Sequence, residues 1–166
     1  MGYRLAIFGA SGFIGKALTQ AAAAQGHTVY ASGRAEPIEQ AHPYHWVSCD
    51  LADPTGEISI PAGVDAVFYL AQSYYYRDFP HHAEDLFTVN AHGVARAALA
   101  ACHAGVRFFC YASSGNVYAP SFAALTEQSP VEPHTPYAAS KLMGEMAAAA
   151  FSSLMQIGRA SCRERV

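Results

Sequence analysis

The sequence has no long apolar run, little charge and few cysteines, and each of these absences argues against a class of protein. Within its 166 residues, no window holds the roughly 18 consecutive apolar residues of a membrane helix. A net charge of −3 without a basic stripe argues against a nucleic-acid binder that relies on phosphate contacts. The four cysteines show no Cys-x-x-Cys spacing, and the N-terminus lacks a signal-peptide pattern. We therefore expect a cytoplasmic protein with reduced cysteines and neither membrane nor nucleic acid as a partner.

The residues that are present favour one packed domain of alternating strands and helices. Hydrophobic residues make up 52% of the chain, far too large a share for a disordered protein. Short apolar runs predict strands over 3–8, 28–31, 44–49, 66–71 and 107–112. Helices are predicted over 13–25, 83–103 and 136–154. This alternation predicts an α/β fold with helices on both faces of a parallel sheet, and we expect Trp46, Phe108 and Phe109 in its core.

A glycine-rich segment joins the first predicted strand to the first predicted helix. It reads Gly9-Ala10-Ser11-Gly12-Phe13-Ile14-Gly15. Gly9 permits a tight turn, Gly12 lets the backbone approach a pyrophosphate, and Gly15 lets the helix pack closely on the sheet. The N–H groups and the positive dipole of the helix N-terminus would then face the phosphates. An ordinary glycine-rich turn is the alternative, but the strand before it and the helix after it favour a dinucleotide site.

The end of the second predicted strand bears on which nicotinamide cofactor such a loop would bind. An NAD site usually has an acidic residue here for the ribose 2′-hydroxyl. This chain has Gly33, followed by Arg34. A guanidinium suits a 2′-phosphate by its charge and its bidentate geometry. We therefore expect NAD(P), with NADP favoured over NAD, and the alternative is that Arg34 is a solvated loop charge.

Tyr137 and Lys141 lie four residues apart in the last predicted helix and so share one face. A tyrosine with an unperturbed pKa of about 10 is a poor base at neutral pH, but a nearby ammonium lowers that pKa. Tyr137 can then take a proton from a substrate hydroxyl while a hydride leaves its carbon. This spacing is also common in ordinary surface pairs. Here it follows both the glycine loop and the segment Ser113-Ser114-Gly115-Asn116-Val117-Tyr118.

With these segments in order, the chain resembles the extended short-chain dehydrogenase/reductase family, the NAD(P)-dependent epimerases and dehydratases, over about residues 3–155. The resemblance implies a Rossmann-like, doubly wound parallel sheet with strand order 3-2-1-4-5. It implies that Tyr137 is the base, that Lys141 also binds the nicotinamide ribose, and that Ser114 rather than Ser113 holds the substrate oxygen. A nucleotide sugar is the favoured substrate class, and a homodimer is implied as well.

The same resemblance places cofactor contacts at the ends of strands. Asp50 would contact the adenine, with a turn residue as the alternative. The segment Leu70-Ala71-Gln72 would lie beside the ribose and the nicotinamide, and Asn90 would support the site from within. The expected cofactor-binding residues are Gly9, Ser11, Gly12, Phe13, Ile14, Gly15, Arg34, Asp50, Leu51, Leu70, Ala71, Gln72, Asn90, Tyr137 and Lys141.

The predicted function is an NAD(P)-dependent epimerase, dehydratase or reductase that acts on a hydroxyl or keto group. A reductase of small carbonyl compounds would use the same residues. A non-catalytic dinucleotide-binding sensor or scaffold is the alternative from another class, although it would not need Ser114, Tyr137 and Lys141 together. No metal is expected, because the histidines at 42, 45, 81 and 82 lack carboxylate or thiol partners at convincing spacing.

The end of the chain breaks the alternation. From Ile157 it reads Ile-Gly-Arg-Ala-Ser-Cys-Arg-Glu-Arg-Val, which resembles the in-frame translation of a common sequencing-library adapter. We therefore expect an incomplete NAD(P)-binding domain over 1–155 and a non-native tail over 156–166, with a solvated native tail as the alternative. The substrate lobe of the family would then be missing, and the fifth strand would be an exposed edge.

Overall fold

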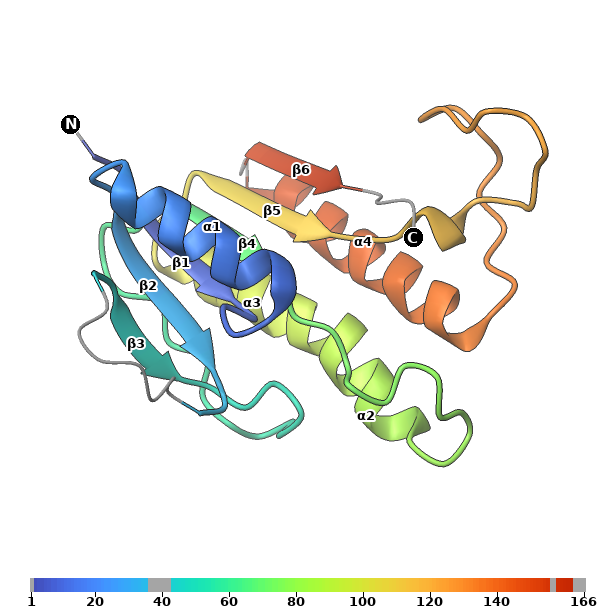
Figure 1. The fold of residues 1–166 in the computed structure, drawn as a ribbon, viewed down its shortest axis with the longest axis horizontal. Helices are drawn as coiled ribbons and strands as arrows, with labels where there is room; N and C mark the ends of the chain where they lie inside the picture. The colour runs from blue at the N-terminus through green and yellow to red at the C-terminus, as the bar shows by residue number, and fades with distance from the viewer. Residues whose placement is uncertain (1, 36–42, 156–157, 163–166) are drawn as a thin grey trace.

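The computed structural model describes residues 2–35, 43–155 and 158–162 (Figure 1). Its strands are β1 (Arg4–Phe8), β2 (Thr28–Gly33), β3 (His45–Ser48), β4 (Ala66–Tyr69), β5 (Phe108–Ala112) and β6 (Gly158–Cys162). Its helical segments are α1 (Phe13–Ala24), α2 (Ala83–Phe87), η1 (Thr88–His92), α3 (Gly93–His103), η2 (Gly115–Val117) and α4 (Pro136–Met155). The bounds of β1 to β5, α1 and α4 fall within a few residues of those predicted from the sequence, whereas β6, η1 and η2 were not predicted.

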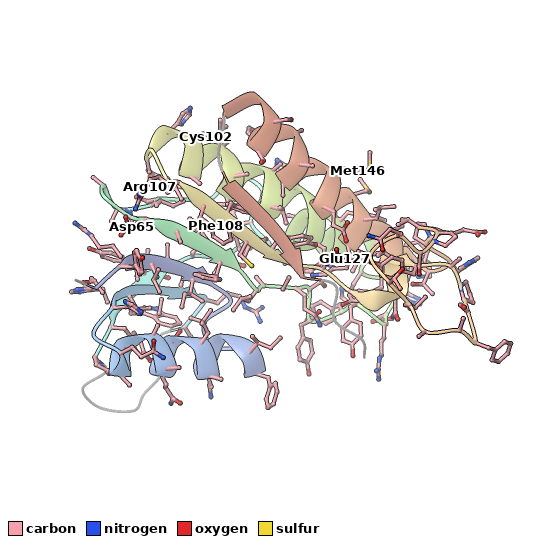
Figure 2. The ribbon with its side chains drawn as sticks, turned by 90° about the horizontal axis from the view of Figure 1, so that it is seen from above. Asp65, Cys102, Arg107, Phe108, Glu127 and Met146 are labelled. Atoms are coloured by element: carbon pink, nitrogen blue, oxygen red, sulfur yellow. The ribbon has the colours of Figure 1, made fainter. Side chains whose placement is uncertain are left out.

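All strands lie parallel in one sheet, in the order β3-β2-β1-β4-β5-β6. Viewed along the sheet, α1 covers one face while α3 and α4 cover the other (Figure 2). The predicted order 3-2-1-4-5 and the doubly wound fold are confirmed. Parallel strands need long crossovers. Each of these helices therefore lies between two strands in the sequence and returns the chain to the end of the sheet where the previous strand began.

The expectation that β5 would be an exposed edge is wrong. Residues 158–162 form β6, which pairs with β5 from Phe108↔Gly158 to Ala112↔Cys162. Strand pairing uses backbone N–H and C=O groups, so it does not need the apolar side-chain pattern on which the sequence argument relied. The crossover through α4 brings the chain back beside β5. The non-native origin of residues 156–166 stays a prediction, and residues 156–157 and 163–166 lie outside the described part.

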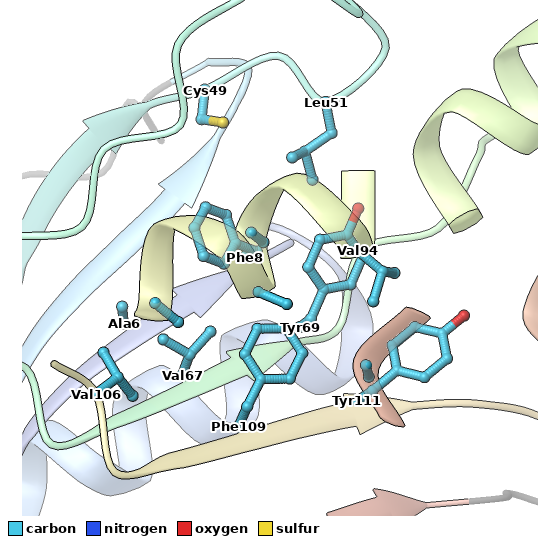
Figure 3. Close-up of a cluster of buried hydrophobic side chains, with 14 of the residues drawn as sticks. Ala6, Phe8, Cys49, Leu51, Val67, Tyr69, Val94, Val106, Phe109 and Tyr111 are labelled. Carbon is cyan, nitrogen blue, oxygen red and sulfur yellow. The ribbon is translucent and has the colours of Figure 1, made fainter. Parts of the chain in front are cut away.

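The core has two layers, one on each face of the sheet. Successive residues of a strand point to opposite faces, so Phe8 faces the α3–α4 layer and Ile7 faces α1. In the larger layer, Phe8 and Tyr69 pack with Val94 of α3 (Figure 3). Burial on both faces explains why the strands read as continuous apolar runs in the sequence. Phe109 lies in this core, whereas Phe108 is 36% exposed, so its predicted core position is wrong.

The helix predicted over 83–103 is divided by a π-helical segment, η1. Such a segment inserts an extra residue into a turn and shifts the face that a helix presents. Three consecutive residues of η1, Val89, Asn90 and Ala91, are buried as a result. The π-helical turn therefore directs the amide of Asn90 into the protein, toward the end of the sheet that carries the candidate site.

The last helix begins as the sequence predicts, with Pro136 as its first residue. The side chain of Thr135 caps it by accepting a hydrogen bond from the N–H of Ala138 at 3.1 Å. No helix in the described ranges is long and apolar enough to cross a membrane.

Candidate active site

A cleft of about 400 Å³ opens at the carboxyl ends of the strands. Open α/β sheets bind their ligands at this end of the strands. The cleft is lined by the glycine loop after β1, by the ends of β2, β3 and β4, and by residues from the helices that follow. Of the expected cofactor-binding residues it brings together Gly9, Ser11, Gly12, Phe13, Ile14, Gly15, Arg34, Asp50, Leu51, Leu70, Ala71 and Gln72. Asn90, Tyr137 and Lys141 are not in this lining.

The glycine loop has the close backbone contacts that its spacing suggested. Gly9 has φ +81°, and a Cβ there would lie 2.7 Å from the backbone N of Ala71. A Cβ at Gly15 would lie 2.1 Å from the carbonyl oxygen of Gly9, so only glycine lets α1 pack this closely. A Cβ at Gly12 would contact only that same carbonyl oxygen, at 3.3 Å. The cradle that the glycine loop forms is therefore packed tightly against the sheet at Gly9 and against the start of α1 at Gly15, and it is open at Gly12.

The N-terminus of α1 points its N–H groups into this cradle. Gly12 is the N-cap and no side chain caps the helix. The first helical hydrogen bond runs from the N–H of Lys16 to the carbonyl of Gly12 at 2.9 Å. The N–H groups of Phe13, Ile14 and Gly15 precede that bond and have no partner within the helix. This arrangement fits the pyrophosphate of a dinucleotide.

At the other end of the cleft, Asp50 and Arg34 carry the charge. Oδ1 of Asp50 accepts a hydrogen bond from the N–H of Ala52 at 3.0 Å, as an Asx-turn residue does. Asp50 is exposed and lines the cleft, so the turn role and a contact with a ligand are compatible. Arg34 is exposed beside it and makes no ion pair with any residue that the structure describes.

Tyr137 connects the last helix to this cleft. Its hydroxyl donates a hydrogen bond to Oε1 of Gln72, a lining residue, at 3.1 Å. One turn later in α4, Lys141 is only 2% exposed, and its ammonium donates to the carbonyl of Ala112 at 2.5 Å. The same ammonium lies 4.6 Å from the ring centre of Tyr111. The carbonyl and the aromatic face both stabilise a buried cation.

The two serines after β5 have different partners. Ser113 donates its hydroxyl hydrogen to Glu145 of α4. Ser114 is 1% exposed, and its Oγ accepts a hydrogen bond from the N–H of Asn116 at 3.2 Å as the N-cap of η2. Through its bond with Ser113, Glu145 ties α4 to the loop that carries Ser114. Among the described residues, no acceptor is recorded for the O–H of Ser114, and Ser114 does not line the cleft.

Asn90 is a buried link between the loop after β4 and the last helix. Its Oδ1 accepts from the N–H of Ser73 at 2.9 Å, and its Nδ2 donates to Oγ of Ser140 at 3.0 Å. Ser140 donates in turn to the carbonyl of Tyr137 at 2.7 Å. Asn90 therefore fixes the loop that holds Gln72 relative to the helix turn that holds Tyr137. Ser73 and Ser140 were missed in the sequence, where Ser140 stands between Tyr137 and Lys141 without any sign of its partner.

Two buried tyrosines flank the site but are unsuited to proton transfer. Burial raises the pKa of Tyr69 and of Tyr111 far above that of a free phenol. Both act as hydrogen-bond donors, Tyr69 to the carbonyl of Val89 at 2.6 Å and Tyr111 to the carbonyl of Asn90 at 3.1 Å. These two hydrogen bonds stabilise η1. Tyr137, by contrast with Tyr69 and Tyr111, is only partly buried.

An aromatic loop lies beside Tyr137. Tyr74 is 79% exposed and lines the cleft, while Tyr75 stacks on His82 with ring centres 3.9 Å apart. The ring centre of Tyr76 lies 5.3 Å from that of Tyr137. In this loop, Tyr75 and Tyr76 therefore pack on the body of the protein, whereas Tyr74 lines the cleft. Among the described residues, no group of three or more His, Cys, Asp or Glu is placed to hold a metal ion.

Comparison with known protein families identifies the chain. A family model described as the NAD dependent epimerase/dehydratase family matches residues 5–162. The chain belongs to this family. Its glycine loop, cleft and Tyr137–Lys141 helix all lie within the matched range.

Individual relatives agree with this family. A UDP-glucose 4-epimerase of Mycolicibacterium smegmatis is 37% identical over 159 residues, covering 86% of this chain and 49% of that protein. A short-chain dehydrogenase/reductase superfamily protein of Agrobacterium tumefaciens, solved with bound NAD, is 30% identical with a TM-score of 0.81, over 97% of this chain and 48% of that one. MoeE5, solved with UDP-glucose and NAD, is 25% identical with a TM-score of 0.76, over 96% of this chain and 52% of that one. The chain thus spans about half the length of these relatives.

Proposed function

We propose that the chain supplies the cofactor-binding and catalytic part of an NAD(P)-dependent epimerase, dehydratase or reductase that acts on a hydroxyl or keto group of a nucleotide sugar. The observation that carries the proposal is the hydrogen bond from Tyr137 to Gln72. It joins the Tyr-x-x-x-Lys helix to a cleft whose glycine cradle fits a pyrophosphate. A phenol in contact with a dinucleotide cleft is suited to moving a proton at the carbon where a hydride is exchanged.

In this proposal each of the three polar residues has one task. Tyr137 takes the proton from the substrate hydroxyl, or returns it to a keto oxygen. The Lys141 ammonium, held by the carbonyl of Ala112, stabilises the phenolate by its charge. The Ser114 hydroxyl donates a hydrogen bond to the substrate oxygen as charge develops there. The nicotinamide ring, when bound, supplies the acceptor or donor of the hydride.

We further propose NADP as the preferred cofactor. Arg34 lines the adenosine end of the cleft beside Gly33, where an NAD site has an acidic residue. Two relatives were solved with NAD, which makes the preference of this chain a matter for measurement. The cytoplasmic location and the homodimer stay predictions, and the proposed function requires neither.

Nucleotide sugars are the proposed substrate class because the relatives named above include a UDP-glucose 4-epimerase and a protein solved with UDP-glucose. The test is to incubate the protein with NADP or NAD and a panel of UDP- and dTDP-sugars, and to follow products by NMR and reduced nicotinamide by absorbance. We expect conversion of at least one sugar, and a loss of about 100-fold or more in turnover for Ser114→Ala. Conversion of small carbonyl compounds alone would favour the reductase alternative. Cofactor binding without turnover of any substrate would favour the non-catalytic module.

A further inference from the structure

Trp46, the only tryptophan of the sequence, lies directly against Gly33 at the end of β2. A Cβ at position 33 would lie 2.9 Å from Cη2 and 3.1 Å from Cζ2 of the indole ring. Its third neighbour would be Oγ of Ser11, at 3.3 Å on the glycine loop. Carbon atoms in contact prefer separations of about 3.5–4.0 Å. Position 33 therefore has room for a hydrogen atom and not for a side chain.

The backbone at position 33 is held in place and cannot move away from the ring. The carbonyl of Ser32 accepts hydrogen bonds from the N–H groups of Gly9 at 3.1 Å and of Ala10 at 3.0 Å. The carbonyl of Gly33 accepts from the N–H of Cys49 at 2.9 Å. Any shift of this strand end would break bonds to the glycine loop on one side and to the end of β3 on the other.

The indole ring is held as well. Trp46 lies in β3, in register with Ala31 of β2, and packs against the apolar cluster between the sheet and α1. Its Nε1 atom is buried, so this edge of the ring lies inside the protein and not at the surface. A side chain at position 33 would have to displace a packed ring, and overpacking of this kind is costly.

The contact has a consequence for the ribose end of the cleft. An acidic side chain at the end of β2 is what binds the 2′-hydroxyl in NAD sites. We propose that Trp46 is a specificity-determining residue, because it fills the space that such a side chain at position 33 needs and leaves Arg34 to read a 2′-phosphate. This inference rests on the proposed dinucleotide site and extends it to a residue that lines no part of the cleft.

The steric part of the proposal is tested by stability alone. In a strand with ordinary backbone angles, Gly→Ala removes conformational freedom from the unfolded chain and is neutral or stabilising. We expect Gly33→Ala to lower Tm by at least about 3 °C because of the ring. In a Trp46→Leu background the same change should leave Tm unchanged or raise it. Tyr44→Leu is the matched control, because Tyr44 packs on the same cluster but not against position 33. An equal loss of Tm in the wild-type and Trp46→Leu backgrounds would overturn the proposal.

The specificity part is tested by calorimetric titration with two probes, 5′-AMP and adenosine 2′,5′-bisphosphate. The wild-type protein should bind the bisphosphate about tenfold or more tightly than 5′-AMP, because a guanidinium–phosphate pair adds charge-assisted hydrogen bonds. Gly33→Asp alone should gain no affinity for 5′-AMP. Gly33→Asp in the Trp46→Leu background should bind 5′-AMP several-fold more tightly than Trp46→Leu does, and the bisphosphate less tightly.

The outcomes separate this inference from the proposed function. If neither probe binds the wild-type protein, the dinucleotide site itself is wrong and the inference is overturned with it. If the probes bind but Gly33→Asp alone gains as much affinity for 5′-AMP as the double variant does, the site stands and the role of Trp46 is overturned. If the double variant fails to fold, the sign of the Gly33→Ala effect in the two backgrounds still decides the role of Trp46.

Discussion

Tyr137 donates its hydroxyl hydrogen to Oε1 of Gln72 at 3.1 Å, across 65 positions of sequence. The bond joins the first turn of α4 to the loop that follows β4. Asn90 joins the same two segments from the protein interior, through its hydrogen bonds with Ser73 and Ser140. The phenol is therefore oriented from the cleft side by Gln72 and from the protein interior by Asn90.

Removing the acceptor at position 72 should weaken catalysis without abolishing it. Gln72→Met removes one neutral hydrogen bond, which is worth about 0.5–1.5 kcal/mol, so turnover should fall by about tenfold or less. Gln72→Glu keeps an acceptor oxygen but places a negative charge beside the phenol, which disfavours the phenolate, so it should lose more turnover than Gln72→Met does. Steady-state rates at saturating cofactor measure both variants. Unchanged turnover in Gln72→Met would show that this bond does not orient Tyr137.

Asn90→Ala should destabilise the protein and slow the reaction together. The change leaves the N–H of Ser73 unpaired in a buried place, at a cost of about 1–3 kcal/mol. It also removes the donor to Oγ of Ser140, which keeps its own hydrogen bond to the carbonyl of Tyr137. Ser140→Ala keeps the bond between Ser73 and Asn90 but removes the bonds of Ser140 with Asn90 and with the carbonyl of Tyr137, so it should cost a similar amount. Urea unfolding gives the free energies and turnover gives the second readout. If Asn90→Ala lost stability but kept full turnover, the amide would be structural only.

Asp65 should make the stability of the protein depend on acid pH. The backbone N–H of Arg4 at 2.9 Å and the guanidinium of Arg107 at 2.8 Å hold the pKa of its carboxyl below its usual value (Figure 2). Because the folded state lowers this pKa, the stabilisation is full above the unfolded value of about 4 and is lost as the pH falls through the folded value. Asp65→Asn should therefore lower Tm at neutral pH and flatten its decline at acid pH.

The matched control for Asp65 is Arg107→Gln, which keeps the bond from the backbone of Arg4 and should flatten the acid decline only in part. Asp65 lies at the end of the sheet opposite the cleft, so neither variant should change cofactor affinity. An acid decline as steep in Asp65→Asn as in the wild-type protein would show that other carboxyl groups cause it.

The fold, the glycine loop and the Tyr137–Lys141 pair could be predicted because local patterns in the sequence determine them. Gly15 is required by its contact with the carbonyl of Gly9, six positions earlier, and Gly9 by its positive φ. The Tyr137–Lys141 spacing follows from one helical turn. The strand order came from the resemblance and is confirmed by the pairing of the strands.

The rest depends on contacts between distant residues that carry no local pattern. The π-helical turn at 88–92 turns Asn90 toward Ser73 and Ser140, which stand 17 positions before it and 50 after it. The contact between Gly33 and Trp46 arises from the register of β2 on β3. The β6 strand was missed because its pairing with β5 uses the backbone, whereas the sequence argument considered side chains.

The most direct test of the account compares Tyr137→Phe with the wild-type protein in cofactor binding and in turnover, on the same preparations. The account assigns the hydroxyl to proton transfer, so turnover should fall by about 100-fold or more. The dissociation constant of NADP should stay within about threefold, because at most one neutral hydrogen bond to the cofactor is lost. Loss of cofactor binding together with activity, or turnover that survives the change, would contradict the assignment of Tyr137 as the base.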